Sequence, residues 1–473
     1  MNTHTTEHRG CASYPLTLVA FCFATAMMIC LADACGSSNN SGGSSSAPPQ
    51  GSCAGQSELF IDPTHNIGYV PIFALDSNGN AQLDVVNLKQ GVSNPIIKTL
   101  SLRGSNLPVG IGFNPNNHTI LEEAASIASG QTSGPVTIYE IDTSSQSVSN
   151  TVAATGLIET YHAGLGNPTA GGGGLVENFK ANKAIVAGSQ TVGVLDTSTD
   201  PPTWDSSSVI GLSDFPAGSF PFQPFLDSIS VNSNTGIMFA SNDGGDDIID
   251  TGSSALTPAL FFPSVQFGIT DGNAFDIDTN ILILSQEVGA DQSWAFNFAT
   301  LDTSSSPASA DYVQVPGLGE AEPVGEGPGG QAAINCATHQ ATIADEFGQN
   351  LKLVHMPSKP VPGALDNNGQ PGSATTPDAA SVYTIAGAII PKGDVGGTPT
   401  QLEMVADPGT EVVDNTHNLM YALAAPNYVP QAWNIGSTGP LFLIRVDLSK
   451  PVLGACPVCS KQWLPDETAI PLQ

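Results

Sequence analysis

Three segments of the chain share one turn signature: Asp62-Pro-Thr-His-Asn-Ile-Gly-Tyr69, Cys336-Ala-Thr-His-Gln-Ala-Thr-Ile343 and Asp414-Asn-Thr-His-Asn-Leu-Met-Tyr421. Looser copies of the turn lie at Asn114–His118, Asn232–Gly236, Asp278–Asn280 and Phe179–Lys183. The last is the weakest, and this third repeat has lost the turn signature. Asn, Asp, Pro and Gly favour tight turns because they bond to their own backbone or tolerate unusual backbone angles. Self-similarity at intervals of this kind predicts a repeat architecture.

Short apolar segments flank each turn, and they predict four strands per repeat. Leu59-Phe-Ile61 precedes a turn, Ile237-Met-Phe239 follows one, Val192-Gly-Val-Leu-Asp196 is a third strand and Ile96–Leu102 a fourth. One four-stranded unit cannot bury both of its faces, so the units must stack around an axis. We therefore predict an all-β chain, with residues 55–473 forming a single β-propeller of about seven four-stranded blades. Its inner strands are predicted near 59–61, 109–113, 175–178, 228–231, 274–277, 332–335 and 411–413.

The first two repeats resemble the YVTN-type repeat propellers. The resemblance rests on Tyr69-Val70, Leu83-Asp-Val-Val-Asn87, Ile97-Lys-Thr-Leu-Ser-Leu102 and Pro108-Val-Gly-Ile-Gly-Phe-Asn-Pro115. It implies a propeller over about residues 55–450. Related propellers include lactonases, quinoprotein-like dehydrogenases and plain binding proteins, so the resemblance does not assign an activity.

The charge balance excludes one large class of partner. The 473 residues contain 12 Lys and Arg against 43 Asp and Glu, a formal net charge of −31. Such a surface repels phosphate backbones, so nucleic acid is not expected to bind. The acidity suits either a soluble extracellular surface or the attraction of metal cations or a cationic ligand.

The N-terminal segment has the layout of an export signal. A polar stretch with Arg9 precedes an apolar run from Leu16 to Leu31, which is short for a membrane span. Ala32 and Ala34 suit cleavage by ordinary signal peptidase, whereas Ala34-Cys35-Gly36 resembles a lipobox in which Cys35 carries the lipid. We favour the lipobox, because the uncharged stretch that follows is typical of a flexible tether.

These features predict the domain organisation and the location. Residues 1–34 are expected to form the signal peptide, and residues 35–54 a lipid-anchored, Ser/Gly-rich tether. Gly36 after the lipidated cysteine favours an outer-membrane lipoprotein, and ordinary cleavage would instead produce a secreted or periplasmic protein.

The cysteines of the mature chain suggest a bridge between its ends. Cys53 precedes the first blade, and Cys456 and Cys459 follow the last. The Cys-x-x-Cys spacing has no second pair to complete a four-thiolate zinc site. Because a propeller brings its ends together, we expect Cys53 to pair with Cys456 or Cys459.

Candidate functional residues fall on two faces of the predicted ring. The turns carry His65, His118, His339 and His417, each on a different blade, so capping of the turn is expected rather than a shared metal. The opposite face is expected to carry an acidic rim made of Asp76, Glu122, Glu123, Glu159, Asp243, Asp246, Asp247, Asp271, Glu287, Asp291, Glu320, Glu322, Glu326, Asp345 and Glu346.

Calcium prefers oxygen ligands of this kind. The candidate metal ligands are Asp243, Asp246, Asp247, Glu320, Glu322 and Asp345. The segments Asp76-x-Asn78-x-Asn80 and Asn242–Asp247 have the oxygen density of a calcium loop without completing an EF-hand.

Two functions remain open from the sequence. The first is a lipid-anchored binding or scaffold module, with calcium as the candidate cofactor and a protein, a glycan or a cationic ligand as partner. The alternative is a lactonase-like or other hydrolytic propeller with a carboxylate-bound metal at the channel mouth. No Gly-x-Ser-x-Gly, His-Glu-x-x-His or phosphate-loop motif that fits its structural context is present, so no catalytic residue is assigned.

Overall fold

A computed structural model describes the propeller part of the chain. Contacts between residues divide the chain into Met1–Ser45 and Ser46–Gln473, and all described residues belong to the second unit. The structure describes residues 57–472 except 58, 73–74, 90–91, 93, 161–173, 213–225, 243–244, 254, 264–268, 289–292, 316–331, 346–349, 357–383, 390–391, 406–410, 427–439 and 450–467.

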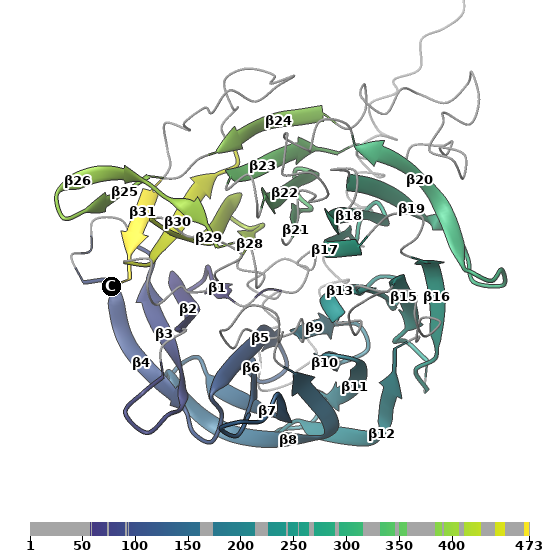
Figure 1. Ribbon diagram of the computed structural model, residues 1–473, viewed down its shortest axis with the longest axis horizontal. Helices are drawn as coiled ribbons and strands as arrows, with labels where there is room; N and C mark the ends of the chain where they lie inside the picture. Colours follow the sequence, from purple (N-terminus) through teal and green to yellow (C-terminus); the bar gives the residue numbers. More distant parts are fainter. Residues whose placement is uncertain are drawn as a thin grey trace, which may run out of the picture. The chain divides into compact units, whose positions relative to one another are not determined.

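Seven antiparallel sheets stand side by side around a common centre (Figure 1). Blades 1 and 2 consist of β1 (Phe60–Asp62), β2 (Ile67–Ile72), β3 (Ala81–Asn87), β4 (Ile96–Leu102), β5 (Leu107–Asn114), β6 (Thr119–Ala125), β7 (Ser133–Asp142) and β8 (Ser147–Thr160). Blades 3 and 4 consist of β9 (Gly174–Asn178), β10 (Lys183–Gly188), β11 (Thr191–Asp196), β12 (Thr203–Gly211), β13 (Leu226–Asn232), β14 (Ile237–Asn242), β15 (Gly245–Asp250) and β16 (Pro258–Pro263). Blades 5 and 6 consist of β17 (Ile269–Asp276), β18 (Ile281–Val288), β19 (Ser293–Asp302), β20 (Ser309–Val315), β21 (Ala332–Asn335), β22 (Gln340–Asp345), β23 (Asn350–His355) and β24 (Thr384–Ile389).

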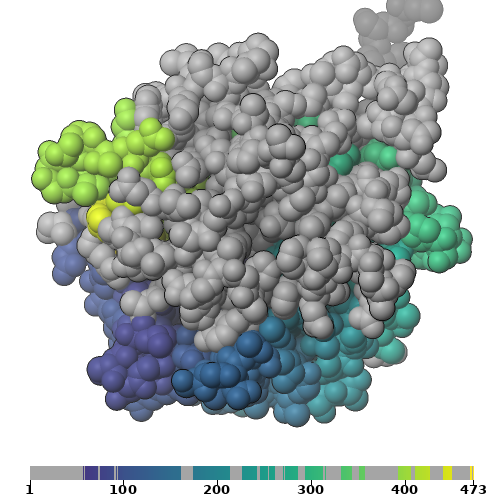
Figure 2. Space-filling model, viewed as in Figure 1, coloured from purple at the N-terminus to yellow at the C-terminus, as the bar shows by residue number. Residues whose placement is uncertain are grey.

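Blade 7 departs slightly from the four-strand pattern. It contains β27 (Glu403–Met404), β28 (Glu411–Asp414), β29 (Leu419–Ala425), β30 (Phe442–Asp447) and β31 (Thr468–Pro471). Both β27 and β28 pair with β29, so together they occupy the inner position. A separate hairpin of β25 (Lys392–Val395) and β26 (Thr398–Gln401) precedes this blade, and in Figure 2 it projects at the rim of the ring. The predicted seven-bladed, all-β fold is confirmed, and every predicted inner strand overlaps an observed one.

Apolar side chains fill every contact between neighbouring blades. Phe60 and Phe113 stack between blades 1 and 2, with ring centroids 5.5 Å apart. The largest cluster spans blades 4 to 6 and includes Phe239, Phe275 and Ile334. Because each strand alternates its side chains between two faces, each blade packs against both of its neighbours.

Among the described residues, packed side chains join the first blade to the last. Every strand of blade 1 comes from the N-terminal end of the ring, and every strand of blade 7 comes from its C-terminal end. One buried cluster joins these two blades, with Ile61 and Val86 on one side and Tyr421 and Leu423 on the other. Hydrophobic burial at this joint therefore holds the two ends of the propeller together.

The repeated turn is explained by side-chain capping at the end of each inner strand. Asp62 Oδ1 accepts the N–H of Thr64 at 3.0 Å, and Asn178 Oδ1 accepts that of Ala181 at 3.2 Å. Four residues after each strand end, a residue has positive φ between 52° and 79°, a region that Asn and Gly tolerate. These residues are Asn66, His118, Asn182, Gly236, Asn280, His339 and Asn418. Blade 3 forms the turn although its sequence has lost the signature, because Asn178 supplies the acceptor and Asn182 the residue with positive φ.

Candidate functional site

The predicted metal ligands that the structure describes are buried in a strand. Asp246 and Asp247 lie in β15 and are 1% and 0% exposed. Asp246 accepts a hydrogen bond from Thr270 Oγ1 of blade 5 at 2.6 Å, and burial raises the pKa of this carboxyl well above its usual value. Asp345 ends β22, but its side chain lies outside the described residues, as do Asp243, Glu320 and Glu322.

Within the described residues, no three His, Cys, Asp or Glu side chains are grouped so that they could hold a metal ion. The calcium site therefore stays a prediction.

A second set of expected rim acids is also buried, at the joints of blade 2 with its neighbours. Glu122 and Glu123 lie in β6, Glu159 lies in β8, and each is at most 1% exposed. Glu159 Oε1 accepts a hydrogen bond from Ser189 Oγ of blade 3 at 2.8 Å. Both carboxyl oxygens of Glu123 lack a hydrogen-bond partner among the described residues. Burial, reinforced by the charges of Glu159 and Glu122, raises the pKa of Glu123 well above its usual value.

Glu177 protects the free edge of an inner strand. Its carboxylate accepts the backbone N–H of Phe113 in β5, directly over Gly112, where a Cβ would overlap the carboxylate. Burial raises the pKa of Glu177 to about 8, although the bond from Phe113 opposes the shift. The N–H of Ile111, two residues earlier on the same edge, is bonded by the carbonyl of Ser57 at 3.1 Å. Glu177 therefore satisfies the backbone N–H of Phe113, which would otherwise be an unpaired donor at the edge of the sheet.

The carboxylate of Asp76, in the connection between β2 and β3, accepts hydrogen bonds from this connection and from β4. Asp76 Oδ1 accepts the N–H groups of Asn78 at 2.7 Å and Asn80 at 2.9 Å, and Ser101 Oγ donates to Oδ2 at 2.8 Å. Hydrogen bonds from Asn80 are the main reason that the pKa of Asp76 lies below its usual value. The carboxylate oxygens thus order the β2–β3 connection.

Three histidines of the turns pair with the aspartates that end inner strands. Nδ1 of His65 lies 2.6 Å from Asp62, and Nδ1 of His417 lies 2.7 Å from Asp414. His339 reaches across to Asp276 of blade 5 at 2.7 Å. Their geometry matches the expected capping role of these turns.

The described residues do not test the predicted disulfide between Cys53 and Cys456 or Cys459. Cys35, Cys53, Cys456 and Cys459 lie outside the described residues. Cys336, in the first turn of blade 6, is disulfide-bonded. If Cys53 pairs with Cys456 or Cys459 in the mature chain, then Cys336 must hold the remaining cysteine of that motif. Peptide mapping under non-reducing conditions distinguishes the three possible connectivities.

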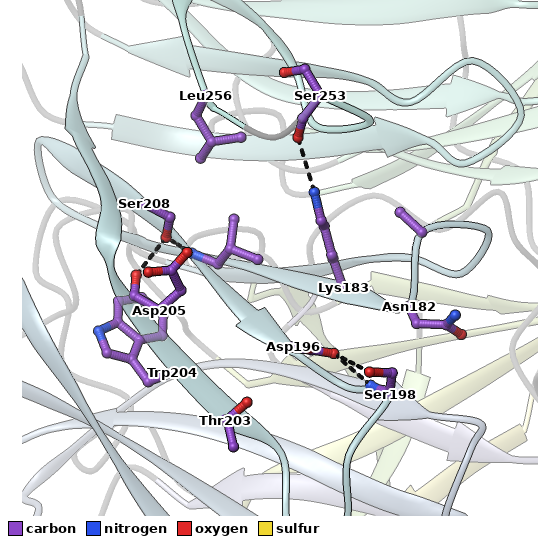
Figure 3. A pocket seen from close by; sticks show the side chains of 12 residues that line it. Asn182, Lys183, Asp196, Ser198, Thr203, Trp204, Asp205, Ser208, Ser253 and Leu256 are labelled. Atoms are coloured by element: carbon purple, nitrogen blue, oxygen red, sulfur yellow. Dashed lines mark hydrogen bonds between the residues drawn. The ribbon is translucent and has the colours of Figure 1, made fainter.

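A pocket of about 470 Å³ lies where the outer strands of blade 3 meet blade 4 (Figure 3). Its lining combines one cation, two carboxylates and several small polar groups with three aliphatic side chains and an indole. The lining residues are Ala181, Asn182, Lys183, Val194, Asp196, Ser198, Thr203, Trp204, Asp205, Ser208, Ser253 and Leu256. The pocket begins where the buried cluster between these blades ends, since Val194 and Leu256 belong to that cluster.

Strand pairing brings the charged groups of the pocket together. Lys183 of β10 stands directly opposite Asp196 of β11, and Asp205 of β12 stands opposite Val194. Because alternate residues of a strand share a face, Lys183, Asp196 and Asp205 lie on the side of blade 3 that contacts blade 4.

Lys183 and Trp204 both tie blade 3 to its neighbours. Lys183 extends toward blade 4, where its Nζ donates to the carbonyls of Thr251 at 3.0 Å and Ser253 at 3.1 Å (Figure 3). Trp204 donates from Nε1 to the carbonyl of Thr155 in blade 2 at 3.0 Å, and its indole packs against the cluster between blades 2 and 3. The indole therefore supports the pocket from behind.

A bulge in β12 orients Asp205. The β11–β12 register shifts between Val192 and Val194, and Ser208 Oγ accepts the N–H of Val194 at 2.8 Å. Asp205 Oδ1 accepts both the N–H and the hydroxyl of Ser207, at 2.9 Å and 2.6 Å. These bonds, with a smaller effect of Lys183, hold the pKa of Asp205 below its usual value. The carboxylate is thus ionised at neutral pH and fixed in direction.

The sequence contained only a weak signal for this pocket. Asp196-Thr-Ser198 and Asp205-Ser-Ser207 are Asp-x-Ser turns, but Asp302-Thr-Ser304 of blade 5 has the same form and lies elsewhere. No local feature marks the first two as neighbours of Lys183, because the contact depends on sheet register.

Likeness to known proteins is found among solved structures alone. No protein-family model and no curated protein matches the chain. Among solved structures, a "putative 6-phosphogluconolactonase" from Bacteroides fragilis NCTC 9343 is 12% identical with a TM-score of 0.49, covering 87% of this chain and 98% of that chain. A protein from Lactobacillus plantarum is 11% identical with a TM-score of 0.47, covering 80% and 92%. The periplasmic gluconolactonase PpgL of Pseudomonas aeruginosa is 12% identical with a TM-score of 0.43, covering 67% and 83%.

Similarity at this level carries no argument about activity.

Among the described residues, no helix is long and apolar enough to cross a membrane.

Proposed function

We propose that this protein is an exported, lipid-anchored propeller that binds a small polar ligand in the pocket between blades 3 and 4. The observation that carries the proposal is the pocket itself, whose ionised groups are held by hydrogen bonds from the surrounding strands. Its volume lies in the range of small-molecule sites. The Leu83–Asn87 and Ile97–Leu102 segments support placing the chain beside the YVTN-type propellers, a group that includes plain binding proteins.

The hydrolytic alternative has no specific support among the described residues. The names of two structural neighbours agree with it, but similarity of that degree speaks for the fold alone. A carboxylate-bound metal would need converging ligands. Among the expected rim acids, Glu122, Glu123, Glu159, Asp246 and Asp247 are buried within blades, and Asp76 orders its own loop.

Filling the pocket tests the proposed function. We expect Thr203→Trp to abolish binding of any small polar probe that the wild-type protein binds, because Thr203 is an exposed lining residue and the indole would occupy the space. Calorimetry with a panel of a hexose, a hexosamine, a hexuronate, a hexose phosphate and a basic amino acid measures this. Thr151→Trp, at an exposed site on β8 outside the pocket, is the matched control. Binding that survives Thr203→Trp, or no binding of any panel member, would overturn the proposal.

Anchoring is tested separately. We expect Cys35→Ser to move the protein from the membrane fraction to the soluble fraction, because an oxygen cannot replace the thioether that carries the lipid. The melting temperature of the released protein should be unchanged, since residue 35 precedes the propeller. Continued partition with membranes would refute lipidation at Cys35.

A further inference from the structure

The pocket between blades 3 and 4 has a net negative charge close to its binding groups. Asp196 and Asp205 contribute two carboxylates and Lys183 one ammonium group. The ammonium group is held by two carbonyl oxygens of blade 4, which further offset its charge. The whole chain is acidic as well, at −31. A negatively charged ligand would therefore meet repulsion both on approach and in the pocket.

The same groups leave hydrogen-bonding positions of both kinds unused. Oδ1 of Asp196 and of Asp205 accepts bonds from Ser198 and Ser207, while Oδ2 of each has no partner among the described residues. Asn182 Oδ1 accepts a bond from Asn116 of blade 2 at 3.2 Å, which turns its Nδ2 donors away from that contact. Lys183 uses two of its three N–H donors.

Neighbouring donors and acceptors of this kind match the hydroxyl group, which donates and accepts at once. A ligand with several hydroxyls can use both carboxylate oxygens as acceptors and the amide and ammonium as donors. An amine on the same ligand would gain a charge-assisted bond to a carboxylate. A carboxylate or phosphate would find the donors of Lys183, Asn182 and the Thr203 hydroxyl, but beside two like charges.

We infer that the pocket selects a polyhydroxylated ligand without negative charge, with a hexosamine preferred over a neutral hexose and both preferred over a hexuronate or a hexose phosphate. This inference rests on the proposed function and names the ligand class of the same pocket. The carboxylates of Asp196 and Asp205 determine this preference between charged, neutral and amino sugars.

The predicted order of affinities is tested with four sugars that share the glucose ring. Glucosamine, glucose, glucuronate and glucose 6-phosphate are each titrated into the mature protein at pH 7. We expect glucosamine to bind about tenfold more tightly than glucuronate, which corresponds to two partly exposed ionic contacts. Raising the NaCl concentration to 0.5 M should shrink this ratio while glucose binding persists.

Asp205→Asn tests whether the Asp205 carboxylate determines the order of sugar affinities. Asparagine preserves the shape and one acceptor, so we expect the glucosamine-to-glucuronate ratio to fall about threefold with little loss of glucose binding. Asp302→Asn is the matched control, because Asp302 forms the same turn with Ser304 on blade 5, outside the pocket. The control should leave the ratio unchanged.

The outcomes separate this inference from the proposed function. Tightest binding of glucuronate or glucose 6-phosphate, blocked by Thr203→Trp, would overturn the charge selection and leave the pocket as the binding site. An unchanged ratio in Asp205→Asn would also overturn the inference. Failure of every probe to bind would instead count against the proposed function.

Discussion

Replacing Glu123 by Gln is expected to raise the free energy of unfolding by about 2 kcal/mol at pH 8 and to have little effect at pH 4. Glu123 is completely buried between blades 2 and 3, and its carboxyl oxygens have no hydrogen-bond partner among the described residues. Ionising such a group in the folded protein is costly, whereas the unfolded chain ionises it freely in water. Glutamine keeps the shape and cannot ionise.

The sign of the pH dependence follows from the raised pKa of Glu123. Between the ordinary glutamate value and the raised value, the folded protein binds more protons than the unfolded chain. The free energy of unfolding therefore falls as the pH rises through this window. Glu122 and Asp246 have pKa values raised by burial as well, and they steepen the same trend. Glu177 adds to it up to about pH 8.

Urea unfolding at pH 4, 6 and 8 measures the effect. Asp302→Asn is a suitable control, because hydrogen bonds from Ser304 hold the pKa of this exposed carboxylate below its usual value. Its replacement should not stabilise the protein at any of these pH values. An equal loss of stability in Glu123→Gln at all three pH values would show that the carboxyl group makes stabilising bonds in both protonation states.

Leu423→Ala should lower the free energy of unfolding by about 2–5 kcal/mol. Leu423 is fully buried in the cluster that joins blade 7 to blade 1. Because no strand is shared between these blades, a cavity there weakens the contact that closes the ring. The loss should be visible as a lower urea midpoint with an unchanged slope.

Two further variants show whether the loss of stability in Leu423→Ala comes from the joint between blades 7 and 1. Ile97→Ala, at a residue of β4 that is 49% exposed, should change stability by less than about 0.5 kcal/mol. Leu121→Ala creates a similar cavity between blades 2 and 3, inside the ring. We expect limited proteolysis to attack blades 1 and 7 earlier in Leu423→Ala than in Leu121→Ala. Equal cleavage in both variants would argue against a weak joint at the closure.

Sequence patterns predicted the inner strands well because each strand ends in a capped turn. Asp62, Asp276 and Asp414 bond to the N–H groups that follow them, so the signal lies within four residues. The turn of blade 3 gave the weakest sequence signal, because Asn178 and Asn182 form it without the surrounding Thr-His pattern. The backbone requires an acceptor and a residue that tolerates positive φ, and it does not require the rest of the motif.

The acidic residues were placed less well, because their environment depends on neighbouring blades. Glu122 and Glu123 were expected at the acidic rim, and they instead lie buried in β6, which continues to Ala125. A carboxylate in a strand looks the same in the sequence whether water or another blade covers it. The pocket around Lys183 and Asp205 was missed for a related reason, since the register of three strands within blade 3 brings these residues together.

By itself, the sequence determined the number of blades, the positions of their inner strands and the acidity of the protein, because short-range turn chemistry and alternation of apolar residues encode them. Only the tertiary structure decided which acids are buried and where a polar pocket opens. Stacking of blade 2 on blade 3 buries Glu123, and the end of the apolar cluster between blades 3 and 4 leaves Asp205 accessible. Burial and charge at each residue depend on the blade packed against it, whose residues are far away in the sequence, as Ser253 is 70 residues from Lys183.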